Sequence, residues 1–445
     1  PKKLEQLQWI PGTDDFAYVF LDNGIKKLYK ENSDVEGRKE LLTLYQLSTA
    51  LTTAGLEPVD SFPKFSWSSA NKIRFWSERK LVDFDFNTNT PQVINYIDTD
   101  GKNADFISPD KIAYTINNNL YIAVNSKQIQ ITKETDKGIV NGQSVHRHEF
   151  GIKKGTFWSP KGNFLAFYRK DETMVTDYPI LDISKRPAVV NYIKYPMAGM
   201  TSQEVTIGVY NLRSQKITWL KTGEPKDHYL AGVTWSPDEQ YIYVNELNRD
   251  QNRMKLSRYN ANTGDLVKVL FEETSDKYVE PMHGPIFFEG DPSMFIWISR
   301  TDGWNHLYLY DAQGAKIVEL TKGDWEITNY DGLSTVGFNI FFTATEQSPL
   351  ERHYYKVDLD RYELSRITKG HGNHNVIRNE NGTKYLDQYD NIEIPYEVSV
   401  IDKDGELIRK VYTAPNPLSE YNLGKTVINS LKSSDGYDLY CSRQC

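Results

Sequence analysis

The segment from Ser144 to Gly151 combines side chains that could do chemistry over a few residues. It reads Ser-Val-His-Arg-His-Glu-Phe-Gly, so basic, acidic and aromatic groups stand side by side. Ser144 is a favourable N-cap, and Gly151 suits the position just past a helix end. These signals predict a short helix of one to two turns over Val145 to Phe150.

Glu149 is the acidic residue of this segment, and two interpretations of it stay open. It is either an ordinary surface charge paired with Arg147 or Lys153, or a carboxylate placed to bind a cation. His146 and His148 stand two residues apart and offer two metal ligands. Because no Cys or His cluster with zinc spacing accompanies them, we expect no metal and no cofactor.

The remaining sequence lacks the common catalytic motifs. It contains no Gly-x-Ser-x-Gly nucleophile elbow, no His-Glu-x-x-His, no Walker loop and no dinucleotide fingerprint. The 60 Asp and Glu residues are too many for a glycosidase acid and base to be chosen by sequence. His306 and His353 each begin an alternating Tyr-rich run. We expect both histidines to be hydrogen-bonded structural residues of strands. We therefore predict no catalytic residue in this chain.

Composition favours a large β-rich protein. The chain has 445 residues, of which 39% are hydrophobic and 13% aromatic, including 29 Tyr and 9 Trp, residues common in strands. A net charge of −8 without a basic cluster argues against a nucleic-acid partner. No apolar run is long enough to cross a membrane. The two cysteines, Cys441 and Cys445, lie in the last five residues, and we expect them to be incidental.

A strand-turn-strand pattern recurs along the chain, most clearly where Trp-Ser-Pro or Ile-Ser-Pro precedes the second strand. A second alternating run and a closing run follow most copies, so each unit has four short strands and a period of roughly 40 to 55 residues. This indicates an all-β fold, a β-propeller of about eight four-stranded blades. The copies are Leu7–Tyr18, Phe65–Trp76, Phe106–Tyr114, Phe157–Phe167, Val233–Tyr243, Ile286–Trp297, Leu333–Phe342 and Val376–Tyr385.

Three segments depart from the repeat. Leu41 to Leu51 has helical spacing and ends near Gly55, and the Pro-rich insertion from Asp171 to Gln203 predicts an extended arm. Ile428 to Tyr440 predicts one more hairpin with an Asp-Gly turn. No linker is evident, so we expect one propeller domain over residues 1–430. Residues 431–445 are then the start of a connection to another domain or the chain end.

Several stretches together resemble one family. They are Glu149–Gly162, Leu165–Arg169, Tyr195–Gly199, Thr222–Pro225, Tyr278–Pro281, Arg300–Asp311 and Ser348–Tyr354, among which Asp-Gly-Trp-Asn-His-Leu-Tyr-Leu-Tyr-Asp is the most specific. The chain resembles the N-terminal propeller of the dipeptidyl peptidase IV group in the prolyl oligopeptidase clan. Within that group its sequence most resembles the bacterial prolyl tripeptidyl peptidases.

The resemblance implies the substrate-gating half of a serine exopeptidase that releases di- or tripeptides after proline. Its partners would be peptides with a free N-terminus and a C-terminal α/β-hydrolase domain carrying the catalytic triad, so this chain alone should be inactive. A homodimer is a further expectation. The family binds the substrate amino terminus through Glu on a short helix. Here Glu149 matches, with Arg147 and His148 as neighbours, and His148 stands where dipeptidyl peptidases have a second Glu.

The resemblance also implies a secreted protein, periplasmic or extracellular, with membrane anchoring through a segment outside this sequence as one option. It begins at Pro1 rather than Met, so we expect a leader to have been removed or left out. A stand-alone propeller that serves as an interaction scaffold is the alternative function. A catalytic propeller with central carboxylates, such as a glycosidase, is a third.

Overall fold

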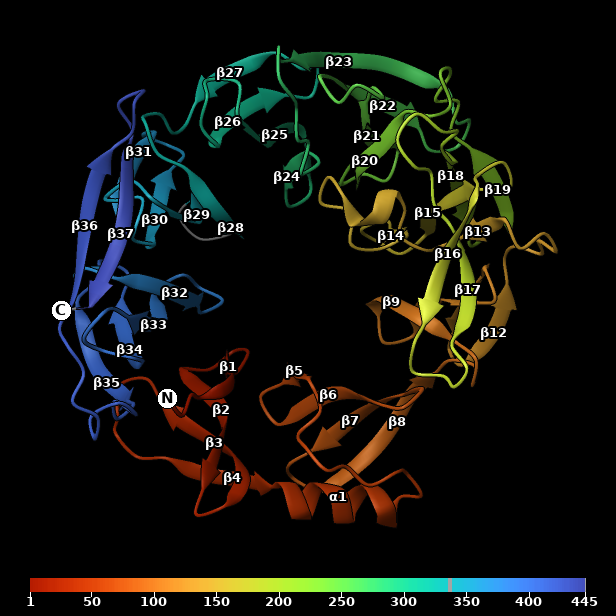
Figure 1. Cartoon of the computed structure of the whole chain (residues 1–445). Coiled ribbons are helices and arrows are strands. Elements are labelled where there is room, and N and C mark those ends of the chain that lie inside the picture. The colour runs from red at the N-terminus through yellow and green to blue at the C-terminus, as the bar shows by residue number, and fades with distance from the viewer. Residues whose placement is uncertain (335–337, 445) are drawn as a thin grey trace. The chain divides into compact units, whose positions relative to one another are not determined.

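The computed structural model describes residues 1–334 and 338–444, and most of their regular structure is β-strand (Figure 1). The described residues contain one α-helix, α1 (Leu44–Thr53), and one 3-10 turn, η1 (His146–His148). Thr43 caps α1 through a capping box, in which its hydroxyl accepts from Gln46 N at 3.1 Å. The predicted helix is therefore confirmed, although it starts later because the residues before it pair as a strand. Among the described residues, no helix has the length and apolarity that a membrane span requires.

The strands form successive antiparallel sheets. In chain order the first four sheets comprise β1 (Glu5–Trp9), β2 (Asp15–Asp22), β3 (Ile25–Asn32) and β4 (Lys39–Thr43); β5 (Phe65–Ser69), β6 (Lys72–Ser77), β7 (Lys80–Asp85) and β8 (Thr90–Tyr96); β9 (Lys102–Ser108), β10 (Lys111–Ile116), β11 (Asn119–Val124) and β12 (Lys127–Gln130); and β13 (Ile139–Asn141), β14 (Thr156–Trp158), β15 (Phe164–Asp171), β18 (Glu204–Asn211) and β19 (Lys216–Trp219).

The next four sheets comprise β20 (Tyr229–Trp235), β21 (Tyr241–Leu247), β22 (Arg253–Asn260) and β23 (Leu266–Thr274); β24 (Ile286–Phe288), β25 (Asp291–Ser299), β26 (His306–Asp311) and β27 (Lys316–Glu319); β28 (Ile327–Leu333), β29 (Asn339–Ala344), β30 (His353–Asp358) and β31 (Glu363–Arg366); and β32 (Asn373–Arg378), β33 (Lys384–Asp390), β34 (Glu397–Asp402) and β35 (Leu407–Thr413). These eight sheets are the blades of a β-propeller, so the predicted all-β fold of about eight blades is confirmed.

Two further hairpins lie outside the blades. β16 (Asp177–Asp182) pairs with β17 (Val189–Lys194), and both are inserted between β15 and β18 of one blade. This hairpin is the extended arm predicted from Asp171 to Gln203. β36 (Thr426–Lys432) pairs with β37 (Asp438–Gln444), as the Asp-Gly turn predicted. Cys445 and the turn residues 335–337 of one predicted repeat lie outside the described residues.

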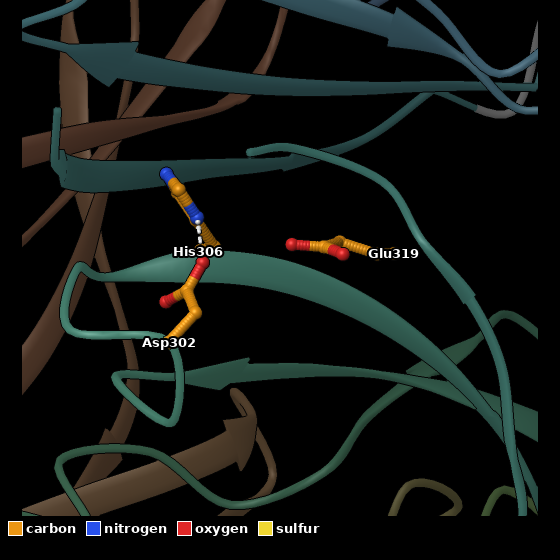
Figure 2. Close-up of side chains that lie close together, drawn as sticks. All are labelled: Asp302, His306 and Glu319. Carbon is orange, nitrogen blue, oxygen red and sulfur yellow. Dashed lines mark hydrogen bonds and ion pairs between the residues drawn. The ribbon is translucent and has the colours of Figure 1, made fainter. Parts of the chain in front are cut away.

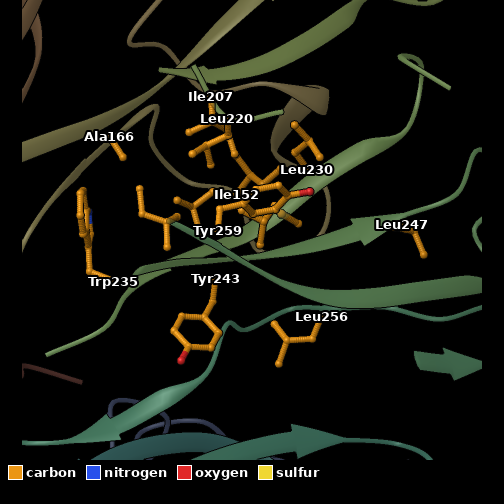
Figure 3. Packing of buried hydrophobic residues seen from close by; sticks show 14 of the residues in the cluster. Ile152, Ala166, Ile207, Leu220, Leu230, Trp235, Tyr243, Leu247, Leu256 and Tyr259 are labelled. Carbon is orange, nitrogen blue, oxygen red and sulfur yellow. The ribbon is translucent and has the colours of Figure 1, made fainter. Parts of the chain in front are cut away.

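The chain divides into two compact units. One contains residues 1–74, 84–90 and 323 onward, and the other contains residues 75–83 and 91–322. The second unit holds the arm, η1 and a large buried cluster that runs from Val145 to Tyr308 along the chain. Figure 3 shows part of this cluster, in which Ile152 lies close to Leu220, which follows β19, and to Leu230 of β20. Each buried aliphatic side chain of this size contributes about 1.5–3 kcal/mol.

The recurrent Trp and Ser of the sequence repeat have defined roles within the second unit. The indole Nε1 of Trp158 donates to Asp105 O at 3.1 Å, and Nε1 of Trp235 donates to Phe157 O at 2.9 Å. Trp158 of β14 and Trp235 of β20 therefore each bind a backbone carbonyl of the preceding blade. Ser236 Oγ accepts from Tyr241 N at 2.9 Å and thus closes the turn that follows Trp235.

The first and last blades are joined within the other unit by the same kind of bond. Trp9 Nε1 donates to Ile377 O at 2.8 Å, across 368 positions of sequence. Arg409 of β35 forms an ion pair with the buried Glu31 of β3 at 2.9 Å. A buried arginine-carboxylate pair of this type is strongly destabilising to break, because one charge is left without compensation.

We predict that Trp235→Phe lowers the free energy of unfolding by about 1–3 kcal/mol, because the carbonyl of the half-buried Phe157 loses its donor while most of the ring volume is kept. Urea unfolding followed by tryptophan fluorescence and circular dichroism measures the change. Trp219→Phe is the matched control, since Trp219 is 40% exposed. Equal effects of the two substitutions would contradict the role of the indole bond.

Candidate functional site

A helical turn lies where the sequence predicts one, but the prediction of a helix over all of Val145 to Phe150 is wrong in length and hand. Only His146–His148 form a turn, and its backbone is left-handed, with φ values of 50° for His146, 52° for Arg147 and 67° for His148. Ser144 does not cap it: no side chain caps the turn, and Ser144 Oγ lies 2.9 Å from His148 Nε2 instead. Left-handed L-residues cost roughly 1–2 kcal/mol each, so the surrounding structure must hold this segment in place.

Burial explains why the turn replaces a helix. Val145 and Phe150 are 2% and 7% exposed, and both belong to the large cluster of the second unit. A right-handed helix advances about 100° per residue, so these two side chains would point about 140° apart and could not both enter one core. The left-handed turn lets both be buried. Glu149, which lies between them and has φ −65°, is exposed.

Two contacts from distant parts of the chain hold the turn. Gly151 has φ +71°, and a Cβ added there would lie 2.2 Å from Met282 O, so this position requires glycine. The ring of Tyr229 on β20 lies between the two ends of the turn, with centroids 4.9 Å from His146 and 5.0 Å from Phe150. The Tyr229 hydroxyl accepts in turn from Arg249 Nη1.

His146 is a buried, neutral part of this packing. Its Nδ1 lies 3.3 Å from Gln203 Nε2, and its Nε2 has no hydrogen-bond partner among residues 1–334 and 338–444. Burial, reinforced by the nearby His228 and Arg249, lowers the pKa of His146 to about 3. With one ring buried and the other bonded to Ser144, His146 and His148 are not arranged as a pair of metal ligands.

The two basic neighbours of Glu149, Arg147 and His148, are engaged elsewhere. The Arg147 guanidinium carbon lies 4.0 Å from the centroid of the Tyr195 ring, and its Nη2 donates to Lys194 O at 3.4 Å. His148 is bonded to Ser144. In the part of the chain that the structure describes, no hydrogen bond or ion pair joins the Glu149 carboxylate to any side chain, Arg147 and Lys153 included. The turn therefore presents an exposed carboxylate that is free to bind a cation.

Sequence reasoning selected Glu149, Arg147 and His148, which the structure places on one turn, but it missed Tyr229 and the contact made by Tyr195. Tyr195 lies 48 positions after Arg147, and Tyr229 lies 82 positions after it. No local spacing in the sequence links either tyrosine to the turn. The motif Tyr195–Gly199 was visible in the sequence, although nothing in it indicated a contact with the turn.

A second group of polar side chains offers three metal-ligand types, two carboxylates and an imidazole. Asp302, His306 and Glu319 have ligand atoms within 4.8 Å of one another, and they are the sole such group of three in the described residues. Figure 2 shows His306 Nδ1 directed at Asp302, at 2.7 Å, with Glu319 to one side. Asp302 also accepts from Trp304 N at 3.2 Å. Asp302 thus orders the loop before β26 and orients the buried His306, a structural role.

His353 is held in the same manner. It is fully buried, with Nε2 2.8 Å from Glu351 Oε2 and Nδ1 3.2 Å from Thr368 Oγ1. Both His306 and His353 are hydrogen-bonded residues at the start of strands, as the sequence predicted.

A family model described as "Dipeptidyl peptidase IV (DPP IV) N-terminal region" matches residues 58–396. The chain belongs to the dipeptidyl peptidase IV N-terminal region family. The dipeptidyl-aminopeptidase B of Aspergillus niger is 27% identical over 475 residues, covering 92% of this chain and 52% of that protein. The dipeptidyl peptidase 4 of Trichophyton rubrum is 26% identical over 350 residues, covering 74% and 45%. This dipeptidyl peptidase IV-type propeller thus spans about half the length of the curated relatives it matches.

Solved structures agree on the fold of this dipeptidyl peptidase IV-type propeller. A structure named as a dipeptidyl aminopeptidase IV from Bacteroides ovatus has a TM-score of 0.87 and 34% identity, covering 99% of this chain and 64% of that one. The dipeptidyl peptidase 4 of Porphyromonas gingivalis has a TM-score of 0.81 at 20% identity, with the same coverage, and is similar in fold.

We predict that Gly151→Ala destabilises the propeller by about 1–3 kcal/mol more than Gly199→Ala, because a new methyl group meets Met282 O at the first site and open space at the second. Both glycines have positive φ, +71° and +77°, so the backbone strain is matched. Thermal unfolding of the two variants measures the difference. Equal losses of stability would contradict the packing of the turn against Met282.

We predict that His146 makes the folded propeller sensitive to acid. Its folded pKa is about 3, below the ordinary value near 6.5, so between these pH values the unfolded chain binds a proton that the folded chain does not. The free energy of unfolding therefore decreases as the pH is lowered from 6.5 towards 3, by up to about 1.4 kcal/mol per pH unit for this group. His146→Asn, which tolerates a left-handed backbone, should flatten the dependence of unfolding free energy on pH between 6.5 and 4.

His371→Asn is the control for this measurement, since the His371 side chain is 97% exposed. Identical pH profiles for the His146→Asn variant and the wild type would show that the buried imidazole carries no such linkage.

Proposed function

We propose that this propeller is the substrate-binding part of a serine exopeptidase and that Glu149 receives the α-ammonium of the peptide substrate. The observation that carries the proposal is the exposed Glu149 carboxylate on a strained turn, whose charged neighbour Arg147 is bound to the arm. Backbone strain concentrates at sites with a function, where the structure holds a group in an unfavourable conformation for a purpose.

The comparisons support the reaction class. The relatives are named as dipeptidyl peptidases, and they are about twice as long as this chain. We propose that the full-length protein has a C-terminal α/β-hydrolase domain with a serine nucleophile, and that residues 431–445 begin the connection to it. The chain's own propeller would then gate and orient the peptide. The alternative of a stand-alone interaction scaffold receives no support from these relatives.

Electrostatics supports an ammonium ligand. A carboxylate and an ammonium about 4 Å apart attract each other by on the order of 4 kcal/mol at an effective dielectric constant near 20. Desolvation of both ions removes part of this energy. The remainder is enough to select peptides with a free N-terminus over internal peptide segments and over N-acylated peptides.

We propose tripeptide release after proline in preference to dipeptide release. His148 occupies the position at which the resemblance places a second Glu, and its ring is bonded to Ser144 within the turn. A single carboxylate then defines the amino-terminal end of the site, which favours the pattern of the prolyl tripeptidyl peptidases. A periplasmic or extracellular location and a homodimer remain expectations of the same resemblance.

We predict that Glu149→Gln in the full-length protein lowers kcat/KM for free-amino tripeptide substrates about a hundredfold. The substitution keeps the shape of the side chain and removes its charge, and a loss of about 2.7 kcal/mol in transition-state binding corresponds to this factor. Hydrolysis of Ala-Ala-Pro p-nitroanilide and of its N-acetylated form measures the effect. The acetylated substrate, which lacks the ammonium, should be poor for wild type and hardly worse for Glu149→Gln.

Glu289→Gln is the control, since Glu289 is another exposed carboxylate of the same unit and lies on a turn between β24 and β25. An unchanged kcat/KM for Glu149→Gln on the free-amino substrate would refute the amino-terminus role.

A further inference from the structure

Arg147 is the cation best placed to neutralise Glu149, because it lies two residues before it on the same exposed turn. The structure holds it away. Its guanidinium carbon lies 4.0 Å from the Tyr195 ring centroid, within the range of a cation-π contact, and Nη2 also donates to Lys194 O at 3.4 Å.

Tyr195 is itself fixed at the base of the arm. Its backbone N donates to Thr176 O at 3.0 Å, and its ring lies 5.5 Å from that of Tyr178. The preceding Lys194 donates from Nζ to Val175 O at 2.9 Å and forms an ion pair with Asp177 at 3.1 Å. The arm therefore supplies a fixed aromatic face against which Arg147 packs.

We propose that Tyr195 is a positioning residue that keeps Arg147 on the arm and so leaves the Glu149 carboxylate available to the substrate's ammonium. An exposed cation-π contact and an exposed ion pair are of similar strength, so the contact with Tyr195 can decide which partner Arg147 takes. Without that ring, Arg147 would pair with Glu149 and compete with the peptide. This inference rests on the proposed function of Glu149 and adds a specificity role for the arm.

The test is a double-mutant cycle in the full-length protein, with Ala-Ala-Pro p-nitroanilide and its N-acetylated form as substrates. Tyr195→Ala should lower kcat/KM for the free-amino substrate about three- to fivefold, mainly through KM, and should leave the acetylated substrate unchanged. Tyr195→Leu should behave in the same way, whereas Tyr195→Phe, which keeps the aromatic face, should match wild type. In an Arg147→Ala background, adding Tyr195→Ala should change kcat/KM less than twofold.

Tyr192→Ala is the matched control, since Tyr192 is 67% exposed on the same hairpin. The inference is overturned if Tyr195→Ala leaves the free-amino substrate unaffected. It is also overturned if the loss persists in the Arg147→Ala background, because Tyr195 would then act through packing alone.

These outcomes leave the role of Glu149 intact when Glu149→Gln still abolishes the preference for free-amino peptides. If Glu149→Gln keeps that preference, the proposed function itself fails, and this inference with it.

Discussion

The candidate site depends on the burial of two side chains, Val145 and Phe150, that lie five positions apart in the sequence. Both side chains enter one core, which a right-handed helix does not allow, and the backbone from His146 to His148 is left-handed instead. That conformation turns Glu149 outward. The energy that holds the strained turn comes from apolar burial and from contacts with the ring of Tyr229, while Gly151 is needed because a Cβ there would meet Met282 O.

The blades supply the fixed frame that this turn needs. Indole groups such as those of Trp158 and Trp235 bind the preceding blade through its backbone, so neighbouring sheets of the second unit keep a defined spacing. The turn connects β13 and β14 in the same unit, and Tyr229 belongs to the next sheet. The fixed backbone sets the place from which the free Glu149 side chain extends, so no loop has to be ordered when a ligand binds, which favours selectivity.

The repeat made the blades predictable, because each copy encodes strand, turn and strand within a dozen residues and the Trp-Ser-Pro pattern marks the turn. The turn at Glu149 was not predictable, although its residues were. Ser144 and Gly151 carry good helix-end signals, yet Ser144 bonds to His148 and Gly151 meets Met282. The burial of Val145 and Phe150 overrides the local helix-end preferences, as tertiary contacts often override local propensity. Tyr195 and Tyr229 act across 48 and 82 positions, a separation at which a single sequence contains no signal.

A crystal structure of the full-length protein with the tripeptide Ala-Ala-Pro bound tests the central claim most directly. The account predicts that the peptide's α-ammonium lies about 3 Å from a carboxylate oxygen of Glu149, with Arg147 still packed on the ring of Tyr195. An ammonium bound by another carboxylate, or a Glu149 side chain paired with Arg147 while the peptide occupies the site, would contradict it.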